Sequence, residues 1–569
     1  MTFGGAAVLG IVPSNRPDVC FLTACSSDGL PLMLAPDDYR NPLLPLGFTP
    51  LAEDRSIALF HPLTRRYVCA APIEADHDTG AVTADRDRAS DWERFALIPV
   101  PEDTLPPRLL ASASVLETVL DIGPEIGRLV SVLAGADRIV VNDVLHAYWP
   151  LLTLAELQRI GREALDTPGL SAKLAALCPG DVWATAGLPG LADWIARREP
   201  RARASEAAAG ARRSGPLGWL GRSLFGHRQS AEPPTPTAQL PRSSKRRIGA
   251  DLEILADAGL RRGTFESFGH VCNAYARAGV RPRHDICIIA TARNEGIYIL
   301  EWIAYHRAIG VEAFFLYSND NDDGSDELLA ALADAGVITW IDNQVEPGGS
   351  AQGKAYGHAF TLLPDALDYR WALVIDLDEY FVFNPAMFRS ARDFLRWQEM
   401  RTADAIAMNW IFMGSGGERR WRDLPVTRRF KRAVDPANPH VKTACRPGMF
   451  IHSGPHFPRT DTRRSFVYRH ATGELHSYHD WASRMPDHAQ AFSDHPNVSL
   501  AGVQHYFFKS AEEYLWKFSR NRGDFSKSEG FSTASLEEIS CAPFWTNTTR
   551  RISWRWTGRS AAYRTWMQR

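Results

Sequence analysis

Between residues 284 and 383, short apolar runs that end in polar residues alternate with segments of helical spacing. The runs are DICIIATARNE, FFLYSNDNDDG, VITWID and WALVIDLDEYFVF, and each predicts a buried strand that leads into a polar loop. GIYILEWIAYHRAIG follows the first run with apolar residues at three- and four-residue spacing and ends at Gly310. Strands that alternate with helices predict a parallel sheet with helices on both faces, and therefore an α/β fold.

The polar residues of this region fall where the predicted strands end. They are Thr291, Arg293, Asn294 and Glu295 after the first strand, Asp320, Asp322 and Asp323 after the second, and Asp376, Asp378 and Glu379 in the fourth. Ligands of open α/β sheets bind at the carboxyl ends of the strands. We therefore expect the functional site to be built from these side chains.

Asp376 and Asp378 flank Leu377 at the mouth of the fourth predicted strand. In an extended chain, alternation sends both carboxylates to one side of the sheet, where they repel each other unless a cation lies between them. Mg²⁺ and Mn²⁺ suit carboxylate and phosphate ligands, and such an ion stabilises a departing diphosphate. The simpler alternative is a pair of solvated loop acids.

A phosphatase is another alternative for the D-x-D pattern. Phosphatases of the haloacid dehalogenase type carry a D-x-D-x-T/V nucleophile loop after their first strand. Here Tyr380 stands where that loop has Thr or Val, and the pattern falls in the fourth predicted strand. Both features disfavour this alternative.

Four motifs occur in order in this region, A-R-N-E, E-W-x-x-x-H, G-V and D-x-D-E-Y. Their residues are Arg293, Asn294, Glu295, Glu301, Trp302, His306, Gly310, Asp376, Asp378 and Glu379. Looser matches follow around Lys442, His505, Lys509 and Lys517, as far as about Phe525. This ordered set resembles GT-A glycosyltransferases and is closest to their family 2-like and family 92-like bacterial branch.

The resemblance implies a Rossmann-like, mostly parallel sheet and a metal-dependent transferase. The implied reaction moves a sugar, with a hexose as the first choice, from a nucleotide-sugar donor to a glycan or other hydroxyl acceptor. A UDP-sugar is the first choice of donor, and Mn²⁺ or Mg²⁺ is the implied cofactor. The implied donor-binding residues are Thr291, Arg293, Glu295, Asp320, Asp376 and Lys509, and the implied metal ligands are Asp376, Asp378 and His505.

Catalysis is assigned to Asp378, with Glu418 and Asp461 as candidates for the base. An inverting transfer needs a carboxylate that takes the proton of the acceptor hydroxyl, and both candidates lie in the segments that the resemblance places on the acceptor side. A retaining transfer needs no such base, and both mechanisms stay open. For His505, a buried structural histidine is the alternative. For the whole domain, the alternative is a carbohydrate-binding or scaffold protein with a degenerate transferase fold, which intact Asp376 and Asp378 disfavour.

Four regions are predicted along the chain: a β-rich module over residues 1–105, a helical region over 106–200, a linker over 201–250 and the transferase domain over 251–569. The β-rich module contains short runs with turn residues between them. Gly80, Trp92, Glu93 and Phe95 resemble one repeat of a fascin-like β-trefoil, so a trefoil-like module is expected there.

Charge limits the partners of the chain. With 64 basic and 66 acidic residues the net charge is −2, so no nucleic-acid partner is predicted. The predicted linker carries ten basic and two acidic residues, and Trp219 and Phe225 lie among its arginines. Peripheral contact of this linker with an anionic membrane is an alternative to a solvated linker. Eight cysteines without a C-x-x-C pair, and no long apolar segment, favour a cytoplasmic protein.

Overall fold

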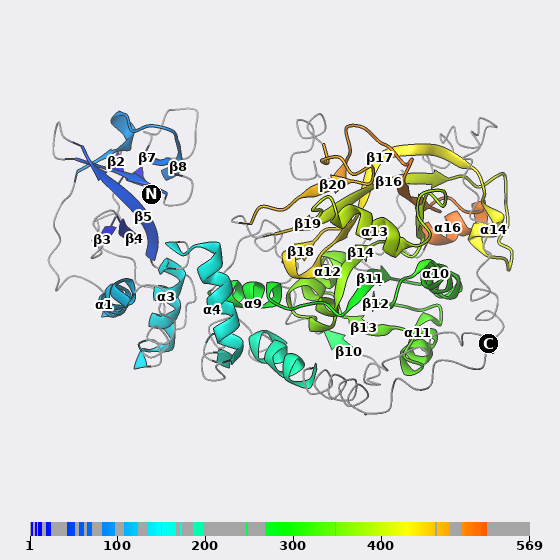
Figure 1. The fold of residues 1–569 in the computed structure, drawn as a ribbon, viewed down its shortest axis with the longest axis horizontal. Helices are drawn as coiled ribbons and strands as arrows, with labels where there is room; N and C mark the ends of the chain where they lie inside the picture. The colour runs from blue at the N-terminus through cyan, green and yellow to red at the C-terminus, as the bar shows by residue number, and fades with distance from the viewer. Residues whose placement is uncertain are drawn as a thin grey trace, which may run out of the picture. The chain divides into compact units, whose positions relative to one another are not determined.

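The computed structural model describes two compact units, which consist of residues 1–192 with 265–279 and residues 193–264 with 280–569 (Figure 1). The described residues are 2–3, 6–7, 10–13, 19–23, 43–51, 56–61, 65–70, 82–96, 107–122, 132, 135–148, 151–166, 171–172, 174, 186–198, 246–248, 268–346, 349–460, 464–477 and 491–519.

An antiparallel sheet forms the β-rich part of the first unit. Its strands follow chain order: β3 (Gly10–Pro13), β4 (Val19–Thr23), β5 (Leu43–Pro50), β6 (Ile57–Phe60), β7 (Tyr67–Ala70) and β8 (Val82–Arg86), with β9 (Arg94–Phe95) beside β6. The short strands β1 (Thr2–Phe3) and β2 (Ala6–Ala7) pair with each other. Cys20, Leu46, Ile57, Leu59 and Val68 form the buried core of this sheet.

Part of the segment that resembles a trefoil repeat can be located. Glu93 is buried and accepts a hydrogen bond from the backbone N–H of Ser90 at 2.8 Å, while Phe95 packs against the core of the sheet. Gly80 and the side chain of Trp92 lie outside the described residues. The trefoil therefore remains a prediction.

Four helices of the first unit are α1 (Pro107–Ile122), α3 (Arg138–Tyr148), α4 (Leu154–Asp166) and α9 (Phe268–Ala278). Arg108 of α1 donates two hydrogen bonds, of 2.8 and 2.6 Å, to the fully buried carboxylate of Asp143 on α3. A Cβ on Gly161 of α4 would lie 2.7 Å from the backbone nitrogen of Ala276, so this glycine allows the close approach of α9. Helix α9 thus belongs with the first unit, although the sequence placed it in the transferase domain.

A ten-stranded mixed sheet organises the second unit. Its order is β10 (Arg246–Ile248), β13 (Thr339–Asn343), β12 (Ala313–Ser318), β11 (His284–Ala292), β14 (Tyr369–Val374), β17 (Ala433–Cys445), β16 (Ala405–Met413), β21 (Ala501–His505) and β15 (Glu379–Phe383), and β20 (Tyr468–His470) pairs with β16. The first five strands are parallel to one another, whereas β17 is antiparallel to both β14 and β16. The predicted α/β fold is confirmed, and the antiparallel part is an addition that the sequence pattern did not reveal.

Strand β11 is covered on both faces. Ile286, Ile288 and Ala290 belong to the main core cluster, together with residues of α10 (Gly296–Ile309) and α11 (Ser325–Asp334). On the opposite face, Thr291 accepts a long hydrogen bond of 3.5 Å from Gln352 of α12 (Ala351–Thr361). This burial on both sides explains why β11 reads as a continuous apolar run.

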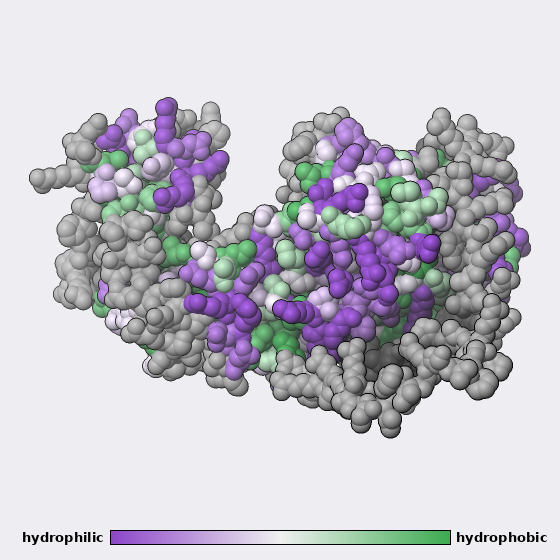
Figure 2. Space-filling model, viewed as in Figure 1, coloured by the Kyte–Doolittle hydropathy of each residue, from purple (hydrophilic) through white to green (hydrophobic). Residues whose placement is uncertain are grey.

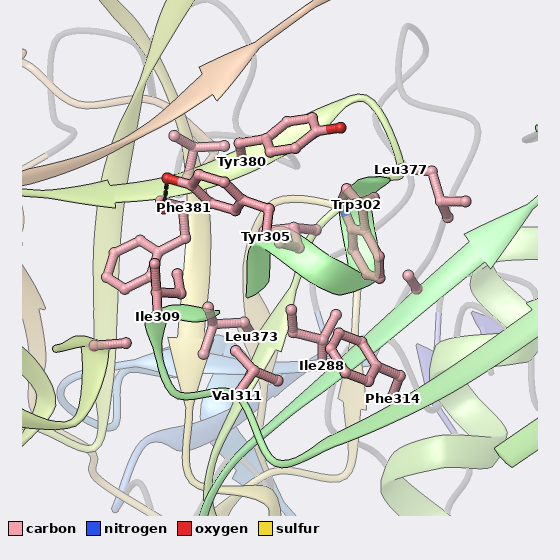
Figure 3. Packing of buried hydrophobic residues seen from close by; sticks show 14 of the residues in the cluster. Ile288, Trp302, Tyr305, Ile309, Val311, Phe314, Leu373, Leu377, Tyr380 and Phe381 are labelled. Atoms are coloured by element: carbon pink, nitrogen blue, oxygen red, sulfur yellow. Dashed lines mark hydrogen bonds between the residues drawn. The ribbon is translucent and has the colours of Figure 1, made fainter. Parts of the chain in front are cut away.

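Helix α10 fixes the strand that follows the acidic motif (Figure 3). The Tyr305 hydroxyl donates to the carbonyl of Phe381 at 3.0 Å, and its ring packs edge-on against Tyr380. His306 is fully buried; its Nδ1 lies 2.8 Å from the carbonyl of Trp302, and its Nε2 accepts from the backbone N–H of Phe381 at 3.3 Å. Because Nδ1 donates, Nε2 is the acceptor, and His306 has a structural role.

The end of the predicted linker forms part of the sheet. Arg246–Ile248 make strand β10, which pairs with β13 in parallel, so the prediction of a linker to residue 250 is wrong for these three residues. Ile248 is buried, and Arg246 pairs with Asp365 at 2.7 Å, which together offset the cost of ordering this basic segment. The rest of the predicted basic linker lies outside the described residues, and its membrane contact remains a prediction.

The described surface is mixed in character. On the visible face, hydrophilic and hydrophobic residues lie interspersed over the described part of the second unit (Figure 2). Among the described helices, none has the length and apolar content needed to cross a bilayer. Five described cysteines, Cys20, Cys69, Cys272, Cys287 and Cys445, are buried free thiols, which pack as small apolar residues.

Candidate active site

The strand order places two polar loops next to each other. Strand β11 pairs with β12 on one side and with β14 on the other, all in parallel. The chain therefore leaves β11 in one direction for β12 and reaches β14 on the opposite side, which makes a topological switch point. The loops that follow β11 and β14 emerge there, and they contain Arg293–Glu295 and Asp376–Asp378. The predicted location of the site at these strand ends is thus supported by the topology.

Asp376 and Asp378 lie in a tight turn between two strands. The backbone N–H of Glu379 donates to the carbonyl of Asp376 at 3.1 Å, and β15 leaves toward β21 rather than continuing β14. The Trp302 indole N–H donates to the carbonyls of Asp376 and Glu379, at 3.1 and 2.8 Å, and so helix α10 holds the turn in place. The sequence pattern placed both aspartates on an extended backbone that sends their side chains to one side, and that prediction is wrong because the backbone turns at Leu377.

The two carboxylates consequently have different partners. Asp376 Oδ2 lies 2.7 Å from the ammonium of Lys442, and Asp376 Oδ1 accepts a hydrogen bond of 3.2 Å from Gln352. Lys442 also lies 3.3 Å from Glu379 Oε2, which in turn accepts from the backbone N–H of Asp376 at 3.0 Å. Lys442 and Glu379 have no exposed side-chain surface, whereas 29% of the Asp376 side chain is exposed. Asp376 is therefore the exposed member of a buried charged cluster.

Burial makes Glu379 a weak acid. Loss of solvation raises the pKa of Glu379 to about 8, with Lys442 opposing this rise and Asp376 and Asp378 adding to it. The pKa of Lys442 is raised, since its two carboxylate neighbours outweigh the loss of solvation. Near neutral pH the cluster thus contains a protonated Glu379 and a charged Lys442. One oxygen of Glu379, Oε1, has no hydrogen-bond partner among the described residues.

Asp378 is surrounded by two lysines and a histidine. Its Oδ2 lies 2.5 Å from Lys517 and 3.9 Å from Lys509, and its Oδ1 lies 3.4 Å from His505 Nε2. Burial alone would raise the pKa of Asp378, but Lys517, His505 and Lys509 outweigh it and hold that pKa well below its usual range. Asp378 is therefore ionised, and the two lysines leave an excess of positive charge around it.

His505 lies directly across the sheet from the acidic turn. In the β15–β21 pairing it is opposite Glu379, and the next residue, Tyr506, donates its backbone N–H to the carbonyl of Asp378 at 2.8 Å. Burial lowers the pKa of His505 more than Asp378 raises it, so the imidazole is neutral at neutral pH. Its ring stacks on Phe412 at 5.0 Å, and Nδ1 has no hydrogen-bond partner among the described residues. A neutral imidazole beside an ionised carboxylate is a suitable pair of metal ligands.

The loop after β11 is tied to the loop after β12. The Asn294 side chain donates to Asp322 Oδ1 at 2.7 Å and accepts from the Asp322 backbone N–H at 2.9 Å. Asn294 and Asp320 have φ values of 53° and 50°, in the left-handed region that few non-glycine residues adopt. Arg293 is buried, while Asp320 is exposed. These contacts join the two loops to which the sequence assigned the nucleotide.

Of the two candidates for a catalytic base, Glu418 can be located in the structure. Glu418 pairs with Arg422 through its carboxylate, and 29% of its side chain is exposed. Its backbone carbonyl accepts from Ala511 at 3.2 Å, at the start of α16 (Ala511–Ser519), the helix that carries Lys517. Asp461 lies outside the described residues. The base thus remains a prediction.

Two contributors were missed as site residues by the sequence reasoning. Lys442 was noted only as part of a motif, although a lysine within the run HVKTAC, which the structure shows as strand, is a signal for a buried counter-ion. Gln352 carries no such signal, because polar residues are common near the start of a helix. Both contact Asp376, from β17 and α12.

The predicted metal ligands fall into two groups. Among the described residues, no three His, Cys, Asp or Glu side chains converge as a metal site. Asp376 is turned to Lys442, while Asp378 and His505 lie side by side. Asp378 and His505 fit one divalent cation as two protein ligands, provided that Lys517 leaves Asp378 and that substrate or water completes the coordination.

Comparison with known proteins gives one family for this region. Residues 286–490 match the model of glycosyltransferase family 92. A family 92 protein of Ricinus communis is 35% identical over 103 residues, 18% of this chain and 18% of that protein. Family 92 proteins of Oryza sativa subsp. japonica and Arabidopsis thaliana are 29% and 28% identical over 103 and 107 residues, which are 18% and 19% of this chain and 17% and 18% of those proteins.

The match is partial on both sides. The chain spans about a fifth of the length of these plant relatives, since the aligned part is 17–18% of each. It supports the family 92-like resemblance; the bacterial branch and the trefoil stay predictions. The second unit therefore contains, over residues 286–490, a domain similar to glycosyltransferase family 92.

Proposed function

We propose that the second unit transfers a sugar from a nucleotide-sugar donor to a hydroxyl acceptor, with a hexose from a UDP-sugar as the first choice and a glycan as the acceptor. One observation carries this proposal. The acidic turn of residues 376–378 lies at the switch point of the sheet, inside the region that matches family 92, and His505, Lys509 and Lys517, which follow that region in the chain, gather on Asp378.

The donor's nucleotide would bind across the loops after β11 and β12. Thr291, Arg293, Glu295 and Asp320 are the proposed contacts, as the sequence indicated. The Asn294–Asp322 hydrogen bonds hold these loops together before the donor arrives, so binding does not have to order them. Asp376 is the proposed acceptor of a hydrogen bond from a donor hydroxyl, because 29% of its side chain is exposed.

The diphosphate would bind near Asp378. Lys509 and Lys517 are the cationic side chains within 4 Å of Asp378 Oδ2, at 3.9 and 2.5 Å. As the bond between the sugar and the diphosphate breaks, negative charge grows on the leaving oxygen. Charged donors that are already in place at that point lower the barrier, because no reorganisation is needed during the reaction.

The predicted Mn²⁺ or Mg²⁺ would be held by Asp378 and His505 together with the donor's diphosphate. When bound, the ion supplies further positive charge to the leaving diphosphate. His505 suits this role since its lowered pKa leaves a lone pair free, and Asp378 suits it since it stays ionised.

The acceptor hydroxyl would lose its proton to Glu418 or Asp461 in an inverting reaction. For Glu418 this requires separation from Arg422, with which its carboxylate is paired. A retaining reaction would leave both residues without this role. The aromatic surface of Phe412 and Phe507 beside His505 offers apolar faces for a sugar ring.

Product analysis with the full chain tests the proposal. The protein is incubated with UDP-, GDP- and ADP-sugars, with and without oligosaccharide acceptors, and the products are identified by mass spectrometry. The proposal predicts release of the nucleoside diphosphate and an acceptor whose mass increases by one sugar. A protein that binds oligosaccharides but turns over no donor would instead support the carbohydrate-binding or scaffold alternative.

A further inference from the structure

The lysines of the site differ in how firmly they are held. Lys442 has no exposed side-chain surface and lies within 3.3 Å of both Asp376 and Glu379. Lys517 is 25% exposed and extends from the last turn of α16 to a single carboxylate, Asp378. Its ammonium also lies 4.3 Å from the ring centre of Phe507. Lys442 is fixed, whereas Lys517 has solvent-accessible space into which it can move.

Lys517 also occupies the position that a ligand of the site would need. Its ammonium lies 2.5 Å from Asp378 Oδ2. A second cation on the same oxygen would lie within a few ångströms of this ammonium, and like charges at such a distance repel strongly in a buried site. Lys517 and a divalent ion therefore exclude each other on Asp378.

A displaced Lys517 needs another negative partner. Asp376 is paired with Lys442 at 2.7 Å, and Glu379 is fully buried and lies 3.3 Å from the same lysine. Under the proposed function, the donor brings a diphosphate to Asp378, within reach of a lysine side chain that already touches this residue. A phosphate oxygen is a strong partner for an ammonium group.

We infer that Lys517 is a donor-binding residue with two partners in turn, Asp378 in the free protein and the donor's diphosphate in the complex. This inference rests on the proposed function. In the free protein Lys517 neutralises a buried carboxylate and keeps cations away from it. In the complex it contributes a charge-assisted hydrogen bond to the leaving group.

The inference makes two opposite predictions for one substitution. Lys517→Met keeps a long side chain and removes the charge. Without its competitor, Mn²⁺ alone should bind about tenfold more tightly, whereas UDP in the presence of Mn²⁺ should bind about 10- to 100-fold more weakly, the value of a hydrogen bond to a charged group. Loss of a lysine with only a structural role would not strengthen Mn²⁺ binding and weaken UDP binding at the same time.

Isothermal titration calorimetry of the full chain measures both affinities. Lys431→Met is the matched control, because Lys431 is exposed and lies in the loop between α14 (Val426–Arg429) and β17. Its affinities should equal those of the wild type. Lys517→Arg should keep both affinities closer to those of the wild type than Lys517→Met does, and it replaces the Met variant if circular dichroism shows that the Met variant is unfolded.

Either of two results would overturn the inference alone: Mn²⁺ affinity that is unchanged or lower in Lys517→Met, or UDP affinity equal to that of the wild type. If Lys517→Met is unfolded, Lys517→Arg is tested in its place. UDP that binds to Lys517→Arg 100-fold more weakly than to the wild type would then contradict a role based on charge. A wild-type protein that binds none of UDP, GDP and ADP with Mn²⁺ would overturn the proposed function as well.

Discussion

The ammonium of Lys442 lies 2.7 Å from the Asp376 carboxylate, and the lysine side chain is completely buried. Lys442 comes from β17, which is antiparallel to β14, and it reaches the turn that β14 leads into. The ion pair therefore joins the parallel and antiparallel parts of the sheet at the site. It also holds in place the carboxylate of Asp376, the aspartate that is partly exposed to solvent.

Loss of this ammonium should destabilise the fold. Lys442→Met leaves Asp376 and Glu379 without their buried cation, and breaking such a pair costs about 3 kcal/mol in the free energy of unfolding. Urea denaturation followed by circular dichroism measures the change. Lys431→Met, on the exposed loop before β17, should change it by less than about 0.5 kcal/mol. A similarly small change for Lys442→Met would contradict a stabilising role of the pair.

Stability should also depend on the protonation of Glu379. Its pKa in the folded protein is raised from 4.5 to about 8, so the folded state holds a proton that the unfolded state has already lost. The stability that this proton contributes is complete below about pH 4.5 and disappears as the pH rises to about 8. Glu379→Gln cannot lose a proton there.

The test compares the unfolding free energies of the wild type and Glu379→Gln from pH 5 to pH 9. The wild type should lose stability relative to the variant as the pH rises, and the difference should become constant above about pH 8. A difference that is the same at every pH would show that Glu379 does not hold a proton in the folded protein.

Much of the parallel half of the sheet could be predicted from the sequence. Strands β11 to β14 are apolar runs because both faces of the sheet are covered, and their polar ends mark the site. The antiparallel strands β16, β17 and β21 were not predicted, because their order depends on pairings between segments far apart in the chain. Strand β10 was missed because its arginines gave it the composition of the adjoining linker.

The site was predicted in part. His505 and Lys509 lie beside Asp378, whereas Asp376 pairs with Lys442, which the sequence did not assign to the site. The predicted side-by-side carboxylates depend on an extended backbone, and the turn at Leu377 sends them to different lysines. Reversal of a strand at an acidic pair is not visible in residue alternation alone.

The indole N–H of Trp302 should matter more for rate than for folding. Trp302→Phe keeps an aromatic ring but removes hydrogen bonds of 3.1 and 2.8 Å to the carbonyls of the acidic turn. A looser turn should lower kcat at least tenfold, because misplacement of reacting groups is costly. Trp371→Phe is the control, since it removes one 2.8 Å bond to Glu399 elsewhere. Equal kcat values for the two variants would contradict a positioning role for Trp302.

Asn294 should affect the donor's KM. Asn294→Ala removes both hydrogen bonds to Asp322 and places alanine at a φ of 53°, so the donor would have to order the two loops as it binds. We expect about a tenfold rise in donor KM with kcat nearly unchanged. Asn294→Gly tolerates the same φ and loses the same bonds, so it should show the same rise. If Asn294→Gly has the donor KM of the wild type, the raised KM of Asn294→Ala is caused by backbone strain and not by the lost hydrogen bonds.

The most direct test of the account is donor turnover by Asp378→Asn, measured by mass spectrometry beside the wild type with the same nucleotide sugar. The substitution keeps the size of the side chain and removes the charge on which Lys517, Lys509 and His505 converge. With the two lysines and the imidazole no longer held in place around the leaving diphosphate, the rate should fall by about 10²- to 10³-fold. Transfer by Asp378→Asn at the wild-type rate would contradict a reaction centred on this turn.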